Sequence, residues 1–340
     1  MIKNFIKWSL SEETKSELKD LQVIDFHSHI WNILERNPKQ IFEKNPDFPV
    51  DIRTIGANFW KFKHPSKFMK KVLEIWPIKN YIIETWKRRN KAANLYTFKE
   101  SMEESAIANA VCLPIEPFQT FDDLLLAKEV NEKIIPFSSV DFTLFRKKDK
   151  NLILDEIERK FIDEIKRWSK WLKIHPIIQW IAPDTDEISE VIEIWTKVSN
   201  QLAILFHTWV TEYCTKNEKC NHKPEYGSIA YFEYVAKNHP QANIVIGHSG
   251  LFEVDEVIKR LYKYDNVYLD TSFQPSEKIK EIIFKFWTKK TLFASDWPYG
   301  DRIPAIKVML NTIEELKSIF GEEKLKERIL RDNAKNLMRI

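Results

Sequence analysis

Short apolar runs alternate with longer amphipathic stretches along most of the chain after Thr97. The runs are rich in Val, Ile and Leu and apolar on both faces, which is typical of strands covered on both sides of a parallel sheet. The stretches between them place apolar residues on one helical face, as Ile188, Val191, Ile192 and Trp195 show. With a first run before the insertion described below, the predicted strands are 23–29, 110–114, 134–140, 171–176, 202–207, 243–246, 266–270 and 291–295.

Helices are predicted between these strands and after the last one. Their ranges are 98–109, 122–133, 152–170, a helix from about 184, then 226–238, 253–264, 277–287, 303–319 and 322–338. Strands and helices in regular alternation predict a (β/α)8 barrel, with a doubly wound open sheet as the alternative. We predict one domain over residues 1–340, because a chain of this length can bury one large core.

The region 30–96 interrupts this alternation and is predicted to be an insertion after the first strand. Residues 30–66 contain four prolines and no sustained period, which indicates a long loop. Helices are predicted over 66–76 and 78–91, with a break at Pro77 because proline disfavours helix in the preceding residue. The barrel is therefore expected to be distorted and to carry a helical cap.

The second half of the insertion is basic and aromatic. Residues 59–91 hold ten Lys or Arg and two Glu, a local charge of +8. We favour a cap whose aromatic side chains pack inward while its lysines stay solvated. The alternatives are a nucleic-acid surface and a positive lid that attracts an anionic substrate. The aromatic residues are Phe59, Trp60, Phe62, Phe68, Trp76, Tyr81 and Trp86.

The overall composition bounds the class of protein. Lys plus Arg total 53 against 50 Asp plus Glu, so the net charge of +3 does not favour a nucleic-acid binder. Three cysteines are too few for a disulfide framework, and no signal-peptide or membrane-spanning run is apparent. We therefore expect a cytoplasmic protein without a membrane partner.

Ionisable residues gather where the predicted strands end. Asp25, His27 and His29 alternate along the first strand and are expected to share one face. The carboxyl ends of barrel strands meet on one face, where the catalytic groups of this fold lie. Histidine and carboxylate ligands suit Zn²⁺, Mn²⁺ or Fe²⁺, and an open coordination position marks a catalytic ion. The other residues at strand ends are His175, His207, His248, Asp270 and Asp296.

Six segments in order closely resemble the amidohydrolase superfamily. The nearest branch is that of the amidohydrolase-related metal-dependent hydrolases, which also contains aminocarboxymuconate semialdehyde decarboxylase. The resemblance runs from about Leu21 to the C-terminus, apart from the insertion. The segments are 25–29 (DFHSH), 206–208 (FHT), 246–250 (IGHSG), 267–272 (VYLDTS), 292–298 (LFASDWP) and 329–334 (ILRDNA).

The resemblance implies one divalent metal, with zinc favoured and manganese or iron as alternatives. Its implied ligands are His27, His29, His207 and Asp296. His248 is implied as the acid/base or carbonyl-polarising group. Asp296 is implied to act both as ligand and as proton acceptor.

Strand four leaves two interpretations open. In relatives with two metals, a lysine on this strand is carboxylated and bridges the ions. We favour one metal, with His175 lining the pocket and Lys173 as a hydrogen-bonding interior residue; a second metal on His175 is the alternative. Asp270 either belongs to the site or ties loops together.

The predicted reaction is hydrolysis of an amide, ester or lactone-type bond in a small, anionic molecule by a metal-bound hydroxide. The first alternative is a non-oxidative decarboxylase, in which Arg53 or the basic insertion supplies a cation. The second is an inactive barrel that binds an acidic partner through lysines 61, 63, 67, 70 and 71. The oligomeric state is left open, with a homo-oligomer as one option.

A polar loop after His207 carries Cys214, Cys220 and His222. A separate zinc site there lacks a fourth ligand, so a surface loop that carries thiols is favoured.

Overall fold

The structure is a computed structural model that describes residues 9–30, 63–147, 149–218, 222–320 and 324–340. Arg53 and the first half of the predicted insertion therefore lie outside the described residues.

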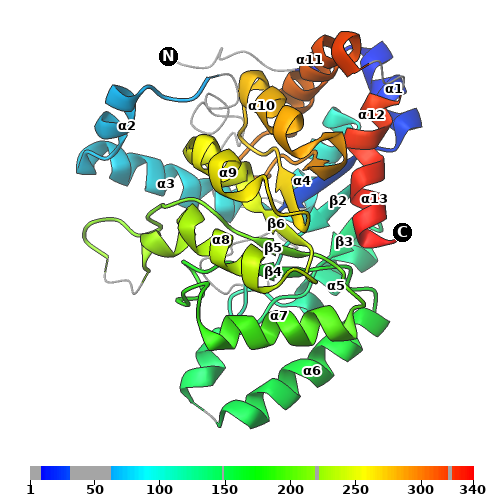
Figure 1. The fold of residues 1–340 in the computed structure, drawn as a ribbon. Helices are drawn as coiled ribbons and strands as arrows, with labels where there is room; N and C mark the ends of the chain where they lie inside the picture. The colour runs from blue at the N-terminus through cyan, green and yellow to red at the C-terminus, as the bar shows by residue number, and fades with distance from the viewer. Residues whose placement is uncertain (1–8, 31–62, 148, 219–221, 321–323) are drawn as a thin grey trace.

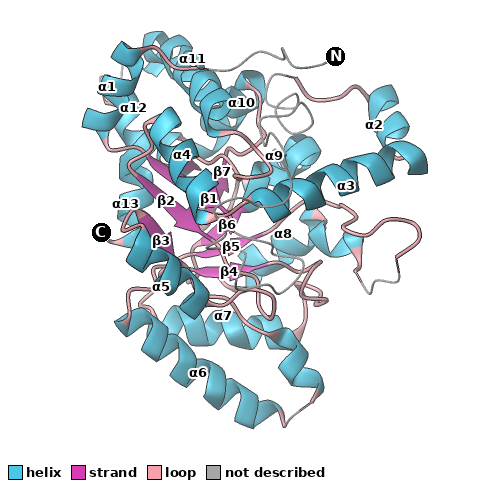
Figure 2. Ribbon diagram, turned by 180° about the vertical axis from the view of Figure 1, so that it is seen from behind, coloured by secondary structure: helices cyan, strands magenta, loops and turns pink. Residues whose placement is uncertain are grey.

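Parallel strands form the centre of the molecule (Figure 2). Each strand in the two sheets pairs with the next strand along the chain, β1 to β3 in one sheet and β4 to β8 in the other. Bridges between Ser138 and Leu172 and between Ser28 and Trp297 join the two sheets at both edges. The predicted (β/α)8 barrel is confirmed. The strands are β1 Ile24–Ser28, β2 Asn109–Cys112, β3 Ile134–Pro136, β4 Leu172–Ile174, β5 Ile204–Phe206, β6 Ile244–Ile246, β7 Val267–Asp270 and β8 Thr291–Leu292.

Helices surround the strands on the outside (Figures 1 and 2). Strands β4, β5 and β6 are buried throughout because helices cover their outer faces while the barrel interior covers the other. The outer helices are α4 Leu95–Ser105, α5 Phe121–Val130, α6 Lys150–Lys166, α7 Asp186–Val198, α8 Ile229–Asn238, α9 Val254–Leu261, α10 Ser276–Phe286, α11 Arg302–Phe320, α12 Leu325–Glu327 and α13 Asn333–Met338.

One helix precedes the barrel and was not predicted. Helix α1, Glu12–Leu21, starts at Ser11, whose side chain accepts a hydrogen bond from the Thr14 amide. It buries only Leu18 and Leu21, so its apolar stripe is too short to stand out in the sequence.

Two cap helices lie outside the barrel beside α8 and α9 (Figure 1). They are α2, Lys67–Leu73, and α3, Trp76–Ala92, with Pro77 in the first turn of α3. Proline has no amide hydrogen, and an amide in the first turn of a helix has no intrahelical acceptor to bond. Pro77 can therefore begin α3 as well as interrupt the helix before it. The two predicted helices are present, with the break shifted by a few residues.

The cap does not bury all its aromatic side chains. Phe68 is 73% exposed and Tyr81 is 72% exposed, so the prediction of inward-packed aromatics is wrong for these two. The cap is instead fixed by Arg89, which is fully buried. Its Nη1 donates to the carbonyls of Pro298 and Tyr299, both at 3.0 Å. These bonds tie α3 to the loop that follows β8.

Among the helices of the described ranges, none combines the length and the apolar character that crossing a bilayer requires.

Candidate metal centre

The two histidines of the first strand have their Nδ1 atoms occupied. His27 Nδ1 lies 2.8 Å from Asp270 Oδ2, and His29 Nδ1 lies 2.9 Å from the Leu113 carbonyl oxygen. Both partners accept only, so each Nδ1 carries the proton. A neutral imidazole has one proton, and therefore both Nε2 atoms present a lone pair.

These two lone pairs meet a carboxylate oxygen. His27 Nε2 lies 3.3 Å from His29 Nε2, and Asp296 Oδ1 lies 3.3 Å from the first and 3.5 Å from the second. Ligands at about 2.0 to 2.1 Å from a tetrahedral ion are separated by about 3.3 to 3.4 Å, so the triangle matches that spacing. No proton is available between the two nitrogens to hold them together, whereas a cation would do so. The donor set therefore fits a divalent metal.

Asp296 reaches the triangle through an unusual backbone conformation. Its φ of 58° lies in the left-handed region, which is costly for a residue with a β-carbon. Its amide donates to the His27 carbonyl oxygen at 2.8 Å, which anchors the loop after β8 against β1. Strain of this kind persists where the surrounding contacts over-determine a functional residue.

The turn after β6 positions His248. Gly247 lies against the Phe206 carbonyl oxygen, which would be 2.6 Å from an added β-carbon. His248 and the glycine two residues on, Gly250, have φ of 56° and 74°. The close approach explains Gly247 and the left-handed φ explains Gly250, whereas His248 adopts its left-handed conformation at a cost. His27, His248 and Asp296 form a group whose ligand atoms all lie within 4.8 Å of one another.

Hydrogen bonds fix the direction of His248. Its Nδ1 lies 2.7 Å from Ser272 Oγ, and the Ser272 hydroxyl donates to Asp270 Oδ1 at 2.5 Å. Because that proton goes to the carboxylate, Ser272 Oγ accepts from His248 Nδ1. His248 Nε2 is then the acceptor, and His207 Nδ1 donates to it at 3.1 Å. Asp270 thus serves the site by orienting His27 directly and His248 through Ser272.

The same series of hydrogen bonds continues to His175, which follows strand β4. Tyr213, from the loop after β5, has its hydroxyl 3.1 Å from His207 Nε2 and 3.1 Å from His175 Nε2. His207 Nδ1 holds its proton, so Tyr213 donates to His207 and accepts from His175. His175 Nδ1 is then an acceptor, and the Ile178 amide donates to it at 3.3 Å. The Ile178 amide can only donate, so the tautomer it requires of His175 agrees with the one set from the Asp270 end.

His207 is therefore engaged at both nitrogens, to His248 and to Tyr213. The structure brings three of the four predicted ligands into one triangle and places His207 one side chain away, beyond His248. Its role as the fourth ligand stays a prediction.

The surroundings of five histidines at the site favour their neutral form. Burial lowers the pKa of each imidazole well below its usual value, and the nearby Lys173 lowers the pKa further. Metal ligation requires this neutral form. The five are His27, His29, His175, His207 and His248.

Lys173 lies inside the barrel, fully buried. Among the described residues its Nζ has no hydrogen-bond partner, so the predicted hydrogen-bonding role is wrong. Burial lowers the pKa of this ammonium group to about 7, while Asp296 and Asp270 oppose the shift.

Asp25 does not join the histidines. Its carboxylate accepts from the Ser28 and Ser295 hydroxyls at 2.8 and 2.6 Å and from Arg302 Nε at 2.9 Å. Pairing between β1 and β2 shifts register between Asp25 and Ser28, and such an irregularity breaks the strict alternation of side chains. Asp25 therefore holds β1 to the segment after β8 and to α11.

A small inner cavity of about 30 Å³ opens beside the triangle. This volume has room for one or two waters. Sequence reasoning missed five of its lining residues because they come from loops and the cap, where no period or spacing marks them. The lining residues are His29, Trp86, His175, His207, Trp209, Tyr213, His248, Phe273, Asp296 and Tyr299.

The loop with Cys214 does not offer a free thiol pair. Cys214 is disulfide-bonded, and its Sγ lies 3.4 Å from His222 Nδ1. A zinc ligand must be a thiolate, so Cys214 cannot serve as one in this state. Cys220 lies outside the described residues.

Comparison with known proteins shows what the chain is similar to. Residues 221–340 match the family model for amidohydrolase. An uncharacterized TIM-barrel protein from Bordetella bronchiseptica is 14% identical, with 93% of this chain and 98% of that chain covered and a TM-score of 0.59.

Two further structures share the fold and hold metals. A 5-carboxyvanillate decarboxylase from Novosphingobium aromaticivorans, complexed with manganese and 4-hydroxy-3-methoxy-5-nitrobenzoic acid, is 12% identical, with 95% and 97% of the two chains covered and a TM-score of 0.57. An amidohydrolase from Burkholderia multivorans with bound zinc is 11% identical, with 94% and 99% covered and a TM-score of 0.51.

No match was found among curated proteins. The family match over residues 221–340 and the shared barrel fold confirm the resemblance of this chain to the amidohydrolase superfamily.

Proposed function

We propose that this protein is a metal-dependent hydrolase that cleaves an amide, ester or lactone-type bond in a small molecule. The observation that carries the proposal is the triangle of His27 Nε2, His29 Nε2 and Asp296 Oδ1, with edges of 3.3, 3.3 and 3.5 Å. Two nitrogen lone pairs and a carboxylate oxygen are held together at the spacing that one ion requires.

A bound divalent ion lowers the pKa of a water to about 7 and polarises a substrate oxygen. Asp270 keeps the proton of His27 on Nδ1 and so keeps Nε2 available. Asp296 has one oxygen in the triangle and the other 3.9 Å from His248 Nδ1. It can accept a proton at the triangle, and His248 can return one to the leaving group once its Nε2 gives up the hydrogen bond from His207.

Zinc is the ion that we favour, with manganese and iron as alternatives. Relatives of this fold carry manganese in one case and zinc in another. We retain His207 as the fourth ligand, which requires its Nε2 to give up the hydrogen bond from Tyr213.

A non-oxidative decarboxylase is the second candidate. It is favoured by the fold shared with 5-carboxyvanillate decarboxylase over 95% of this chain. In that reaction His248 would deliver a proton to the substrate carbon as carbon dioxide leaves. Turnover in heavy water separates the two reactions, because only decarboxylation places a deuteron on carbon.

Metal analysis of the full chain, purified without chelator, tests the proposal. We expect about one equivalent of zinc, manganese or iron by plasma mass spectrometry, and less than a tenth of that in a His207→Ala variant that stays folded. Full occupancy in the variant would show that His207 is not a ligand.

The absence of bound metal from the unmodified protein, even after incubation with each ion, would overturn the proposal. Salt-dependent binding of an acidic partner through the basic insertion would then favour the inactive barrel.

A further inference from the structure

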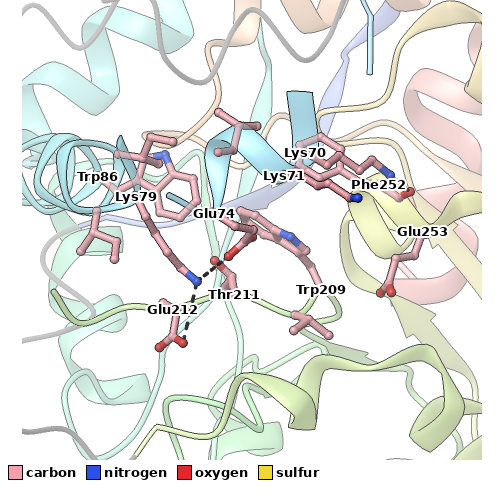
Figure 3. A pocket seen from close by; sticks show the side chains of 14 residues that line it. Lys70, Lys71, Glu74, Lys79, Trp86, Trp209, Thr211, Glu212, Phe252 and Glu253 are labelled. Carbon is pink, nitrogen blue, oxygen red and sulfur yellow. Dashed lines mark hydrogen bonds and ion pairs between the residues drawn. The ribbon is translucent and has the colours of Figure 1, made fainter. Parts of the chain in front are cut away.

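A second, larger pocket lies outside the inner cavity (Figure 3). It has a volume of about 390 Å³, within the range of small-molecule sites. Cap helices α2 and α3 form one side, and the loops after β5 and β6 form the other. We call it the outer pocket; its apolar wall consists of Leu73, Ile82, Ile83, Trp86, Trp209, Val210 and Phe252.

Trp86 and Trp209 line both the outer pocket and the inner cavity. Their rings meet edge to face with centroids 5.2 Å apart. Trp86 comes from the cap and Trp209 from the loop two residues after His207. The two spaces therefore share a wall, and the inner one, at about 30 Å³, has no room for more than a small reacting group.

Most charges at the outer pocket are already paired. Lys79 Nζ lies 2.6 Å from Glu74 and 3.9 Å from Glu212, and Figure 3 marks both ion pairs with dashed lines. Lys70 Nζ donates to the Phe252 carbonyl oxygen at 2.9 Å. These groups hold the cap against the barrel loops and have little left to offer a ligand.

Two groups remain. Within the described part of the chain, Lys71 lines the pocket without a hydrogen bond or ion pair. Glu253 Oε2 is buried and has no hydrogen-bond partner among the described residues. A buried acceptor without a partner costs free energy that a ligand donor would recover.

We propose that the outer pocket binds the body of the substrate, a largely apolar ring compound with a carboxylate for Lys71 and a hydroxyl for Glu253. The inference rests on the proposed function, since it assigns the inner cavity to the reacting bond. The carboxylate bound by Lys71 is not the group that reacts, because the reacting end lies past the two tryptophans. The apolar wall supplies most of the affinity, and the two polar groups select the ligand.

Calorimetric titration of the metal-loaded full chain with two ring compounds tests this. β-Naphthoate carries only the carboxylate and β-naphthol only the hydroxyl. We expect both compounds to bind. Lys71→Ala should weaken the affinity for β-naphthoate about three- to tenfold and leave the affinity for β-naphthol within about twofold of its original value. Glu253→Leu should do the reverse.

Lys67→Ala is the matched control, because Lys67 is exposed on the same helix and does not line the pocket. It should leave both affinities unchanged. Ile82→Trp, which fills the pocket, should weaken both compounds at least about tenfold while the melting temperature shows the chain folded.

Binding that is indifferent to Lys71→Ala, Glu253→Leu and Ile82→Trp would overturn the inference. The same titration on His27→Ala separates it from the proposed function. If that variant lacks metal but binds β-naphthoate, the outer pocket stands by itself. If the unmodified protein holds no metal but binds through Lys71, only the proposed function fails.

Discussion

The inner cavity and the outer pocket share two tryptophans but are built in opposite ways. In the inner cavity the ionisable groups are buried, and hydrogen bonds assign each imidazole one tautomer. In the outer pocket the charges sit at a partly exposed rim, such as Lys79 with Glu74, and the wall is apolar. Exposed ion pairs contribute little stability, whereas a buried polar group costs stability wherever it lacks a hydrogen-bond partner.

This difference indicates that the barrel provides the reactive groups, whereas the cap and the loops beside it select the ligand. The histidines and the aspartate that line the inner cavity come from strand ends of the barrel, where the backbone is rigid. The outer pocket takes half its lining from helices α2 and α3 of the insertion. Changes to the inner cavity should therefore affect metal and turnover, and changes to the outer pocket should affect ligand affinity.

The largest expected effect is that of His27→Ala. It removes one corner of the triangle, so bound metal should fall from about one equivalent to below about a tenth, and turnover should fall at least a thousandfold. Metal content by plasma mass spectrometry and a turnover assay measure this. His239→Ala is the control, since His239 lies at the end of α8 and contacts Ser189. Retained metal in His27→Ala would disprove the triangle.

His248→Ala should separate proton transfer from metal binding. His27, His29 and Asp296 remain, so we expect near-normal metal content with turnover lower by about a hundredfold or more. Unchanged turnover would mean that another group moves the proton.

Asp270→Asn should weaken metal binding without abolishing it. The amide can no longer take both protons, from His27 Nδ1 and from Ser272, so metal affinity should fall about ten- to a hundredfold. Competition with a chelator of known affinity measures the loss. Outer-pocket affinity for β-naphthoate should stay the same, and a fall in both would contradict the separation of the two sites.

Lys173→Met should stabilise the metal-free protein in a pH-dependent way. The folded pKa of about 7 lies below the unfolded value of about 10.4, so the folded state loses stability as pH falls from about 10 to about 7. Removing the amine should raise the free energy of unfolding by about 1 to 4 kcal/mol at pH 7 and by little near pH 10. Urea unfolding at both pH values measures the gain; an equal gain at both would contradict a depressed pKa.

The smallest effect concerns Arg89→Met, which releases α3 from the loop after β8. Losing its bonds to Pro298 and Tyr299 should lower the free energy of unfolding by about 1 to 3 kcal/mol. It should also weaken β-naphthoate, with metal content unchanged. Arg88→Met, exposed on the same helix, is the control for urea unfolding and titration. Loss of metal with intact outer-pocket affinity would reverse the expected pattern.

Much of the barrel followed from the sequence because two simple periods govern it, and the ligand set followed from the resemblance to the amidohydrolase superfamily. Buried strands ending in His or Asp predict both the fold and the convergence of His27, His29, His248 and Asp296 on one rim. Asp25 was expected to share a face with His27 and His29 but does not, because β1 shifts register after Asp25.

The loop and cap residues could not be predicted in this way. Tyr213 and Trp209 lie in a loop without regular spacing, and Trp86 lies on a helix whose burial depends on the neighbouring barrel loops. Phe68 and Tyr81 illustrate the same limit, since aromatic character alone did not show which side faces solvent. The unpartnered Nζ of Lys173 depends on which side chains cross the barrel interior, which spacing does not reveal.

The run of hydrogen bonds from the Ile178 amide to Asp270 has a fixed donor at one end and a fixed acceptor at the other. The Ile178 amide can only donate and the Asp270 carboxylate accepts, so the run has a single direction and cannot reverse. An extra proton on His248 would leave two donors facing each other somewhere between His248 and the Ile178 amide, so the run holds His248 in one neutral tautomer.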